Sequence, residues 1–141
     1  MNGGMVAAAA GLVWLGMVIA ISFLEAPLKF RAPGITVPLG LGIGRLVFRA
    51  LNIAEAVLAL IVLAGLALAA WPAAGFWLLA AILILVVQLA VVRPVLQRRS
   101  NRVLAGETSG KRSRMHRVYP ALEAFKVVAL LAGGLLLLAT L

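Results

Sequence analysis

Four long apolar stretches constrain the fold of this chain more than any other feature of its sequence. A helix needs about 20 predominantly apolar residues to cross the hydrocarbon core of a bilayer. Windows at about 6–28, 46–70, 76–97 and 118–141 meet that requirement. Hydrophobic residues make up 65% of the chain, more than a water-soluble domain of this length can bury. The sequence therefore predicts an all-α membrane protein, a four-transmembrane-helix bundle that forms a single domain over residues 1–141.

The basic residues predict how this bundle is oriented. All 13 Lys and Arg residues lie in 29–49, in 93–117 or at Lys126. Because cytoplasmic loops carry an excess of Lys and Arg, we expect cytoplasmic loops at about 29–45 and 98–117 and both termini on the non-cytoplasmic side. We expect a multi-pass location in the bacterial inner membrane. The basic loops favour contact with anionic lipid headgroups over binding of nucleic acid.

The first of these loops has an unusual composition. The segment "RAPGITVPLGLGIGR" contains two prolines and four glycines but almost no polar side chain. Irregular backbone is tolerated at membrane depth only where protein or water satisfies it. We therefore expect an irregular loop that packs against the cytoplasmic helix ends, and insertion of residues 32–44 into the bundle stays open. No strand precedes "GLGIGR", so its glycines indicate a tight turn rather than a nucleotide site.

Polar residues recur near the cytoplasmic end of each expected helix. At a rise of about 1.5 Å per residue, Glu55, Gln88 and Lys126 lie roughly 12–15 Å inside the expected boundary, and Glu25 and Glu123 lie closer to the surface. An ionised group at the centre of a membrane helix costs about 3 kcal/mol, which pairing with an opposite charge largely removes. These side chains are therefore expected to face the interior in one shared layer.

Two pairings are predicted within this layer. Glu55 is expected to pair with Lys126, and Glu25 or Glu123 with Arg49 or Arg93. The candidate residues for binding a substrate or ion are Glu25, Asn52, Glu55, Gln88, Tyr119, Glu123 and Lys126. The basic residues expected at the cytoplasmic surface are Arg49, Arg93, His116 and Arg117.

Two classes of function remain open for these residues. The first is binding or transport of a small substrate or ion by the polar layer. The second is a structural or accessory subunit, or a self-associating scaffold, that docks a second copy or a larger membrane complex through small residues. The glycines concerned are Gly11, Gly16, Gly65, Gly133 and Gly134.

An enzymatic role has less support in the sequence. The chain has no cysteine and one histidine, so thiol chemistry is excluded and neither a metal site nor a cofactor is expected. Catalysis at the lipid interface, with Glu25 or Glu123 as general base, is a third hypothesis that no nucleophile motif supports.

Four motifs resemble, in their order and spacing, a known family. They are "GMVIAISFLEAPLKFRAPG", "GIGRLVFRALN", "VVRPVLQ" and "RMHRVYPALEAF". The resemblance is to a family of small four-helix membrane proteins of unknown function, whose animal relative is associated with cisplatin resistance. It covers nearly the whole chain, and the matching residues are Gly16, Met17, Phe23, Pro27, Phe30, Val47 and Phe48. Glu25, Lys29 and Glu123 depart from the family pattern. The resemblance implies a membrane bundle and little about mechanism.

Overall fold

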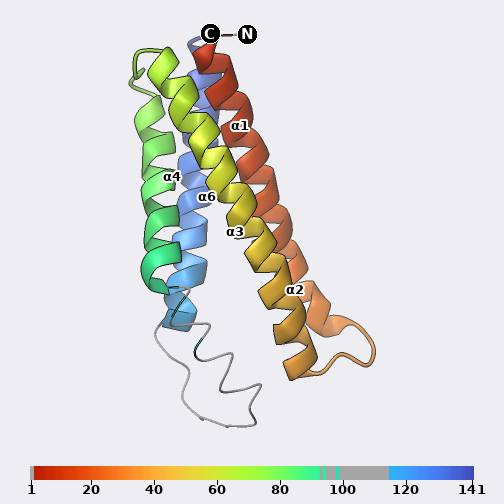
Figure 1. Ribbon diagram of the computed structural model, residues 1–141. Helices are drawn as coiled ribbons and strands as arrows, with labels where there is room; N and C mark the ends of the chain where they lie inside the picture. The colour runs from red at the N-terminus through yellow and green to blue at the C-terminus, as the bar shows by residue number, and fades with distance from the viewer. Residues whose placement is uncertain (1, 93, 95–97, 99–114) are drawn as a thin grey trace.

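The chain forms a bundle of long helices in the computed structural model, which describes residues 2–92, 94, 98 and 115–141 (Figure 1). The described helices are α1 (Gly3–Val18), the π-helical η1 (Ile19–Glu25), α2 (Ala26–Leu28), the 3-10 turn η2 (Lys29–Arg31), α3 (Val37–Leu68), α4 (Gly75–Val87), the π-helical η3 (Gln88–Val92) and α6 (Met115–Ala139). Both chain ends and the 69–74 turn lie together. We call this the terminal end of the bundle.

Three helical stretches are long and apolar enough to cross a membrane. They are Gly3–Arg31, Val37–Leu68 and Val118–Ala139, whereas the fourth, Gly75–Val91, is shorter. Large apolar side chains cover the outside of the described helices, and Leu68, for example, is 82% exposed. Such a surface is unfavourable in water and normal in lipid. The prediction of an all-helical fold is therefore confirmed for the described residues, and their apolar surface is compatible with a membrane protein.

Small residues let the helices approach closely. Helix α1 packs against both α3 and α6, and α6 also packs against α4. A Cβ atom added to Gly65 of α3 would lie 2.6 Å from the carbonyl oxygen of Gly3 in α1. Leu78 of α4 fits between Gly11 and Gly133, where an added Cβ would lie 3.1 Å and 2.9 Å from its side chain. Backbone contact through small residues is the usual basis of helix packing in membranes.

The prediction of an irregular loop over residues 29–45 was wrong for most of its length. Residues 29–31 continue the first helical stretch, and α3 begins at Val37 rather than at about 46. The Thr36 hydroxyl accepts a hydrogen bond of 3.2 Å from the backbone N–H of Leu39 and so caps the helix. Pro38 lies in the first turn, where its missing N–H costs nothing.

Two glycines of this segment, Gly40 and Gly44, form a helix contact, whereas Gly34 lies in the turn before α3 with a positive φ of 79°. A Cβ atom added to Gly40 would overlap the ring of Phe30, and one added to Gly44 would lie 2.9 Å from Lys29 Nζ. These two glycines are one helical turn apart and face η2. The Gly-rich composition thus permits contact between the first two long helices at the end opposite the termini.

Two π-helical segments interrupt the regular helices. At the end of η1, the backbone N–H of Ala26 donates to the carbonyl oxygen of Ile21, five residues earlier. Pro27 follows directly, and its ring could not fit against a carbonyl in a regular helical turn. The segment η3 begins at Gln88, where α4 ends. Each π-helical segment carries polar side chains, which lead to the candidate site.

Candidate functional site

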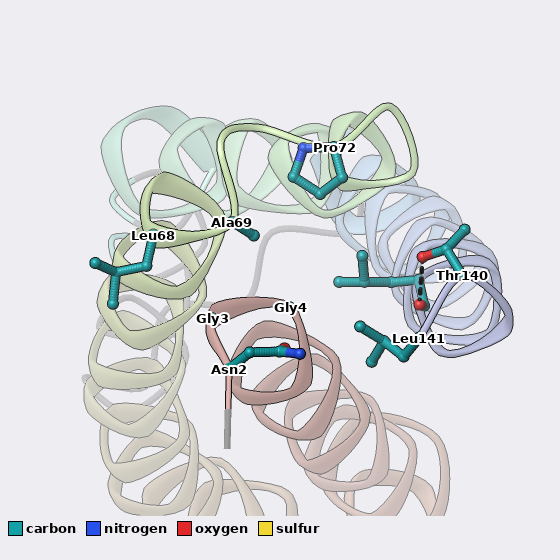
Figure 2. A pocket seen from close by; sticks show the side chains of 9 residues that line it. Asn2, Gly3, Gly4, Leu68, Ala69, Pro72, Thr140 and Leu141 are labelled. Atoms are coloured by element: carbon teal, nitrogen blue, oxygen red, sulfur yellow. Dashed lines mark hydrogen bonds between the residues drawn. The ribbon is translucent and has the colours of Figure 1, made fainter.

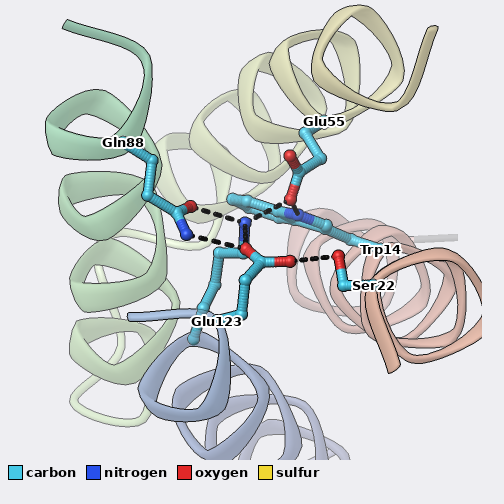
Figure 3. Close-up of polar contacts among 6 residues, drawn as sticks. Trp14, Ser22, Glu55, Gln88 and Glu123 are labelled. Carbon is cyan, nitrogen blue, oxygen red and sulfur yellow. Dashed lines mark hydrogen bonds and ion pairs between the residues drawn. The ribbon is translucent and has the colours of Figure 1, made fainter. Parts of the chain in front are cut away.

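A buried ammonium group lies at the centre of the polar layer (Figure 3). Lys126 Nζ of α6 is 2.5 Å from Oε1 of Glu55, 2.5 Å from Oε1 of Glu123 and 2.8 Å from Oε1 of Gln88. The predicted Glu55–Lys126 pair is therefore confirmed. Glu55 comes from α3 and Gln88 from η3, so this one side chain joins three helical elements.

Three further hydrogen bonds extend the network. Trp14 Nε1 of α1 donates to Glu55 Oε1 at 2.8 Å, and Gln88 Nε2 donates to Glu123 Oε1 at 2.8 Å. The Ser22 hydroxyl of η1 donates to Glu123 Oε2. Figure 3 shows Ser22 beside Glu123 and Trp14 beside Glu55. We call these six residues the polar cluster: Trp14, Ser22, Glu55, Gln88, Glu123 and Lys126.

The charged members of the polar cluster are removed from the surface. Glu55 and Lys126 are 0% exposed, and Glu123 is 1% exposed. Glu55, Gln88 and Lys126 each lie 13 residues from the terminal end of their helical stretches (68 − 55, 88 − 75 and 139 − 126). At 1.5 Å per residue this is about 20 Å, against a hydrocarbon core about 30 Å thick. The predicted shared layer is present.

The two buried carboxylates differ in how well their oxygens are satisfied. Glu123 accepts from Ser22 on Oε2 and from Gln88 on Oε1, and its Oε1 also forms an ion pair with Lys126. Glu55 accepts from Trp14 and Lys126 on Oε1, while its buried Oε2 has no hydrogen-bond partner. An unpartnered carboxylate oxygen away from water is costly. This oxygen is the open position of the cluster.

Glu25 belongs to a separate pair at the edge of the bundle. Its Oε2 lies 3.8 Å from Nζ of Lys29, which also lies 5.5 Å and 5.8 Å from the ring centroids of Phe30 and Phe48. The expected pairing with Arg49 was wrong, because both acids pair with a lysine of their own helical stretch, at spacings i,i+4 and i,i+3. Arg49 is exposed.

Two further binding candidates, Tyr119 and Asn52, lie one helical turn from acids of the cluster. Tyr119 is buried one turn before Glu123 and packs edge-to-face on Phe48, with ring centroids 6.0 Å apart. Asn52 is half-buried one turn before Glu55. Three surface candidates cannot be placed: Arg93 lies outside the described residues, and His116 and Arg117 are described as backbone of α6 only. The structure thus gathers four of the seven binding candidates, Glu55, Gln88, Glu123 and Lys126.

Two members of the cluster were missing from the sequence-based candidates. Trp14 and Ser22 come from the first helical stretch, which supplies no buried charge. A tryptophan in the middle of an apolar helix was the available signal, because a buried indole N–H needs an acceptor. The signal for Ser22 was its i,i+3 spacing from Glu25, which predicts that both residues lie on one inward face of the first helix.

A cavity of about 330 Å³ lies at the terminal end of the bundle, away from the polar cluster (Figure 2). Its polar side chains are already used: Asn2 caps α1 by accepting from the Met5 N–H, and Thr140 donates to the carbonyl of Leu137. The other lining residues are Gly3, Gly4, Leu68, Ala69, Pro72, Leu137 and Leu141. The cavity therefore lacks the convergent polar groups of a specific site.

The polar cluster brings two acids, one base and neutral hydrogen-bonding groups together. In the described part of the chain, no group of three or more His, Cys, Asp or Glu side chains is arranged to hold a metal ion. In this described part, the Ser22 hydroxyl group donates to the Glu123 carboxylate and has no histidine partner that could activate it as a nucleophile. Comparisons with protein-family models, with curated proteins and with solved structures give no match. The function is therefore argued from the cluster itself.

Proposed function

We propose that this chain is a four-span membrane protein, with both termini on the non-cytoplasmic side, that binds or transports a small ion or polar substrate at the polar cluster. The observation that carries the proposal is Glu55, a fully buried carboxylate with one oxygen left without a partner. Ionisable residues at membrane depth are costly, and those that persist mark ion and substrate pathways. We propose in addition that the chain is related to the family of small four-helix membrane proteins that it resembles, and that its basic loops contact anionic lipid headgroups.

The composition of the cluster supports a binding role over a purely structural one. A network that only fixes helix register needs one acid for one base, or neutral groups alone. Here two acids, Glu55 and Glu123, converge on the single base Lys126. Burying the second acid in hydrocarbon is energetically costly, and a leucine of similar size would pack equally well without that cost. A requirement to bind something positive accounts for it.

The structural or scaffold role remains the alternative, and the glycines named for it are largely used within the chain. Gly11, Gly65, Gly133 and Gly134 each lie against another helix of the same chain. Gly16 alone of the five has open space around the position of a Cβ atom. Of these five glycines, only Gly16 is therefore open to a partner. This leaves the polar cluster as the feature with the stronger functional argument.

Ion flux into liposomes tests the proposal. Purified protein is reconstituted into sealed liposomes that contain fluorescent indicators for protons, sodium or potassium, and a gradient of one ion at a time is imposed. We expect one of the three gradients to collapse faster with the wild-type protein than with Glu55→Gln, whose amide keeps the shape of the side chain. Rates equal to those of Glu55→Gln and of protein-free liposomes for all three ions would favour the scaffold role.

Thiol labelling tests the proposed topology. Because the chain has no cysteine, single cysteines at the exposed positions Ala32 and Ala73 provide one reporter at each end of the bundle. A membrane-impermeant thiol reagent applied to intact cells should label Ala73→Cys and spare Ala32→Cys. Labelling of both positions, or of Ala32→Cys alone, would contradict the assigned orientation.

A further inference from the structure

We infer that the ion taken by the polar cluster is a proton, that the carboxyl group of Glu55 holds it, and that it arrives through Ser22 and Glu123. This inference rests on the proposed function and specifies its ion.

The charges that face Glu55 do not balance. Helix α6 brings the acid Glu123 and the base Lys126 to Glu55. Helix α1 adds the neutral indole of Trp14. The neutral amide of Gln88, from η3, is linked to Glu55 through its hydrogen bond with Lys126. With both carboxyl groups ionised, these described groups carry one net negative charge. A net charge buried at this depth is strongly unfavourable, and a carboxyl group there neutralises by taking up a proton. One bound proton makes the cluster neutral.

The hydrogen bonds indicate which carboxyl group carries this proton. Glu123 accepts hydrogen bonds from Ser22 on Oε2 and from Gln88 on Oε1, and Oε1 also pairs with Lys126, so both of its oxygens are occupied. Glu55 has two donors on Oε1 and none on Oε2. A proton placed on Glu55 therefore sacrifices no existing hydrogen bond on Oε2, whereas a proton on Glu123 would compete with a donor already there.

A larger cation fits the cluster poorly. The contacts among its side chains are direct, at 2.5 to 2.8 Å, so no shell of oxygens is left for a metal ion. Metal cations of the hard type need six or more oxygen ligands, whereas only one carboxylate oxygen, Glu55 Oε2, is unpartnered here. The ammonium of Lys126 would also repel a second cation. A proton needs one lone pair and no cavity.

The proton is expected to reach the cluster from the end of the bundle opposite the termini. Ser22 is only partly buried in η1, and the half-buried Glu25 lies one turn beyond it. Toward the terminal end, the described interior beside Trp14 is apolar, with Ala7, Val62 and Leu66 among its buried residues. The Ser22 hydroxyl can accept one proton while it donates another. It therefore links the surface to Glu123.

The transfer balances without any other reactant. Water gives a proton to the Ser22 oxygen as the Ser22 hydroxyl proton passes to Glu123 Oε2. The Glu123 carboxyl group then rotates to turn this proton toward Lys126. Lys126 gives a proton to Glu55 and takes the proton from Glu123, and the Glu55 carboxyl group rotates to exchange its oxygens. Ser22, Glu123 and Lys126 end in their starting protonation states. The net change is one proton moved from water to Glu55.

Infrared spectroscopy of the purified protein in lipid tests this assignment, because a protonated carboxyl group has its own C=O stretching band. At neutral pH the wild-type protein should show one such band from the cluster, and raising the pH should abolish it. Either Glu55→Gln or Glu123→Gln should remove the band, since one acid and one base then remain. Lys126→Met should double its intensity. Glu25→Gln, a change outside the cluster, should leave it unchanged.

Two further variants locate the proton and its route. Trp14→Phe removes a donor to Glu55 and should shift the band, whereas Ser22→Ala should leave its position unchanged but slow its exchange in heavy water at least about ten-fold. A shift in Ser22→Ala with none in Trp14→Phe would place the proton on Glu123 and overturn the assignment.

The outcomes also separate this inference from the proposed function. No protonated carboxyl band in the wild-type protein, together with flux of sodium or potassium that needs Glu55, would overturn the proton and leave ion transport standing. A band that no change of bath pH removes would overturn both, because a permanently protonated Glu55 is a structural group.

Discussion

Removal of the ammonium group from the polar cluster should lower stability by an amount that the structure allows us to work out. In Lys126→Met an unbranched apolar side chain replaces the base, and the carboxyl groups of Glu55 and Glu123 lose the contacts of 2.5 Å that they share. With one proton already bound, a second carboxyl must now become protonated. A free glutamic acid has a pKa of about 4.3, and each pH unit is worth about 1.36 kcal/mol. Holding one more proton at about pH 7 thus costs about 3.7 kcal/mol.

This figure agrees with the general cost of breaking a buried ion pair, about 3–5 kcal/mol. At roughly 3 °C per kcal/mol for a chain of this size, the melting temperature should fall by about 10 °C. The assay is thermal unfolding in detergent, followed by tryptophan fluorescence or circular dichroism. Glu55→Gln is the matched control: it removes the acid that must be kept protonated, so it should retain or exceed wild-type stability near neutral pH.

The pH dependence provides a sharper test of the same reasoning. The folded variant holds one proton more than the folded wild-type protein, so the difference in stability between them should shrink as the pH falls, by about 1.4 kcal/mol per pH unit. The charge arrangement would be refuted if Lys126→Met melted within about 2 °C of the wild-type protein near neutral pH. It would also be refuted if the difference in stability between the two proteins grew as the pH fell.

Four other substitutions test separate positions by the same thermal assay. Trp14→Phe removes the indole donor to Glu55 and should cost about 1 kcal/mol. Gly65→Ala should be clearly destabilising, because the new Cβ would lie 2.6 Å from a backbone carbonyl of α1, whereas Gly42→Ala has open space and should stabilise α3 by up to about 1 kcal/mol. Arg49→Gln should change stability by less than about 0.5 kcal/mol, because Arg49 is exposed. Equal effects of the two glycine substitutions would contradict the close approach of α1 and α3.

The sequence predicted the helices and the central pair because both follow from one physical requirement. A bilayer forces long apolar segments into helices, and the cost of a lone charge forces Glu55 and Lys126 together. The i,i+3 and i,i+4 spacings of Glu123 with Lys126 and of Glu25 with Lys29 were also visible in the sequence. The prediction instead assigned Glu25 and Glu123 to arginine partners on other helices, although residues at these spacings lie on the same helix face.

The start of α3 could not be read from composition alone. Glycine and proline are usual signs of a loop in a soluble chain, and residues 32–44 are rich in both. The contacts of Gly40 and Gly44 with Phe30 and Lys29 are tertiary and leave no trace in the local pattern. In a membrane helix, a glycine that permits close packing gains more from that contact than it loses in helix propensity.

The π-helical segments explain how side chains from opposite sides of the bundle reach one ammonium group. A π-helical turn holds more residues than an α-helical turn, so it rotates whatever follows it about the helix axis. In the first stretch, η1 separates Trp14, which faces Glu55, from Lys29, which faces Gly44. In the fourth, η3 begins at Gln88 itself. Irregular helical turns therefore occur at two of the six cluster positions, Ser22 and Gln88, and π-helical turns of this kind are frequent at functional sites.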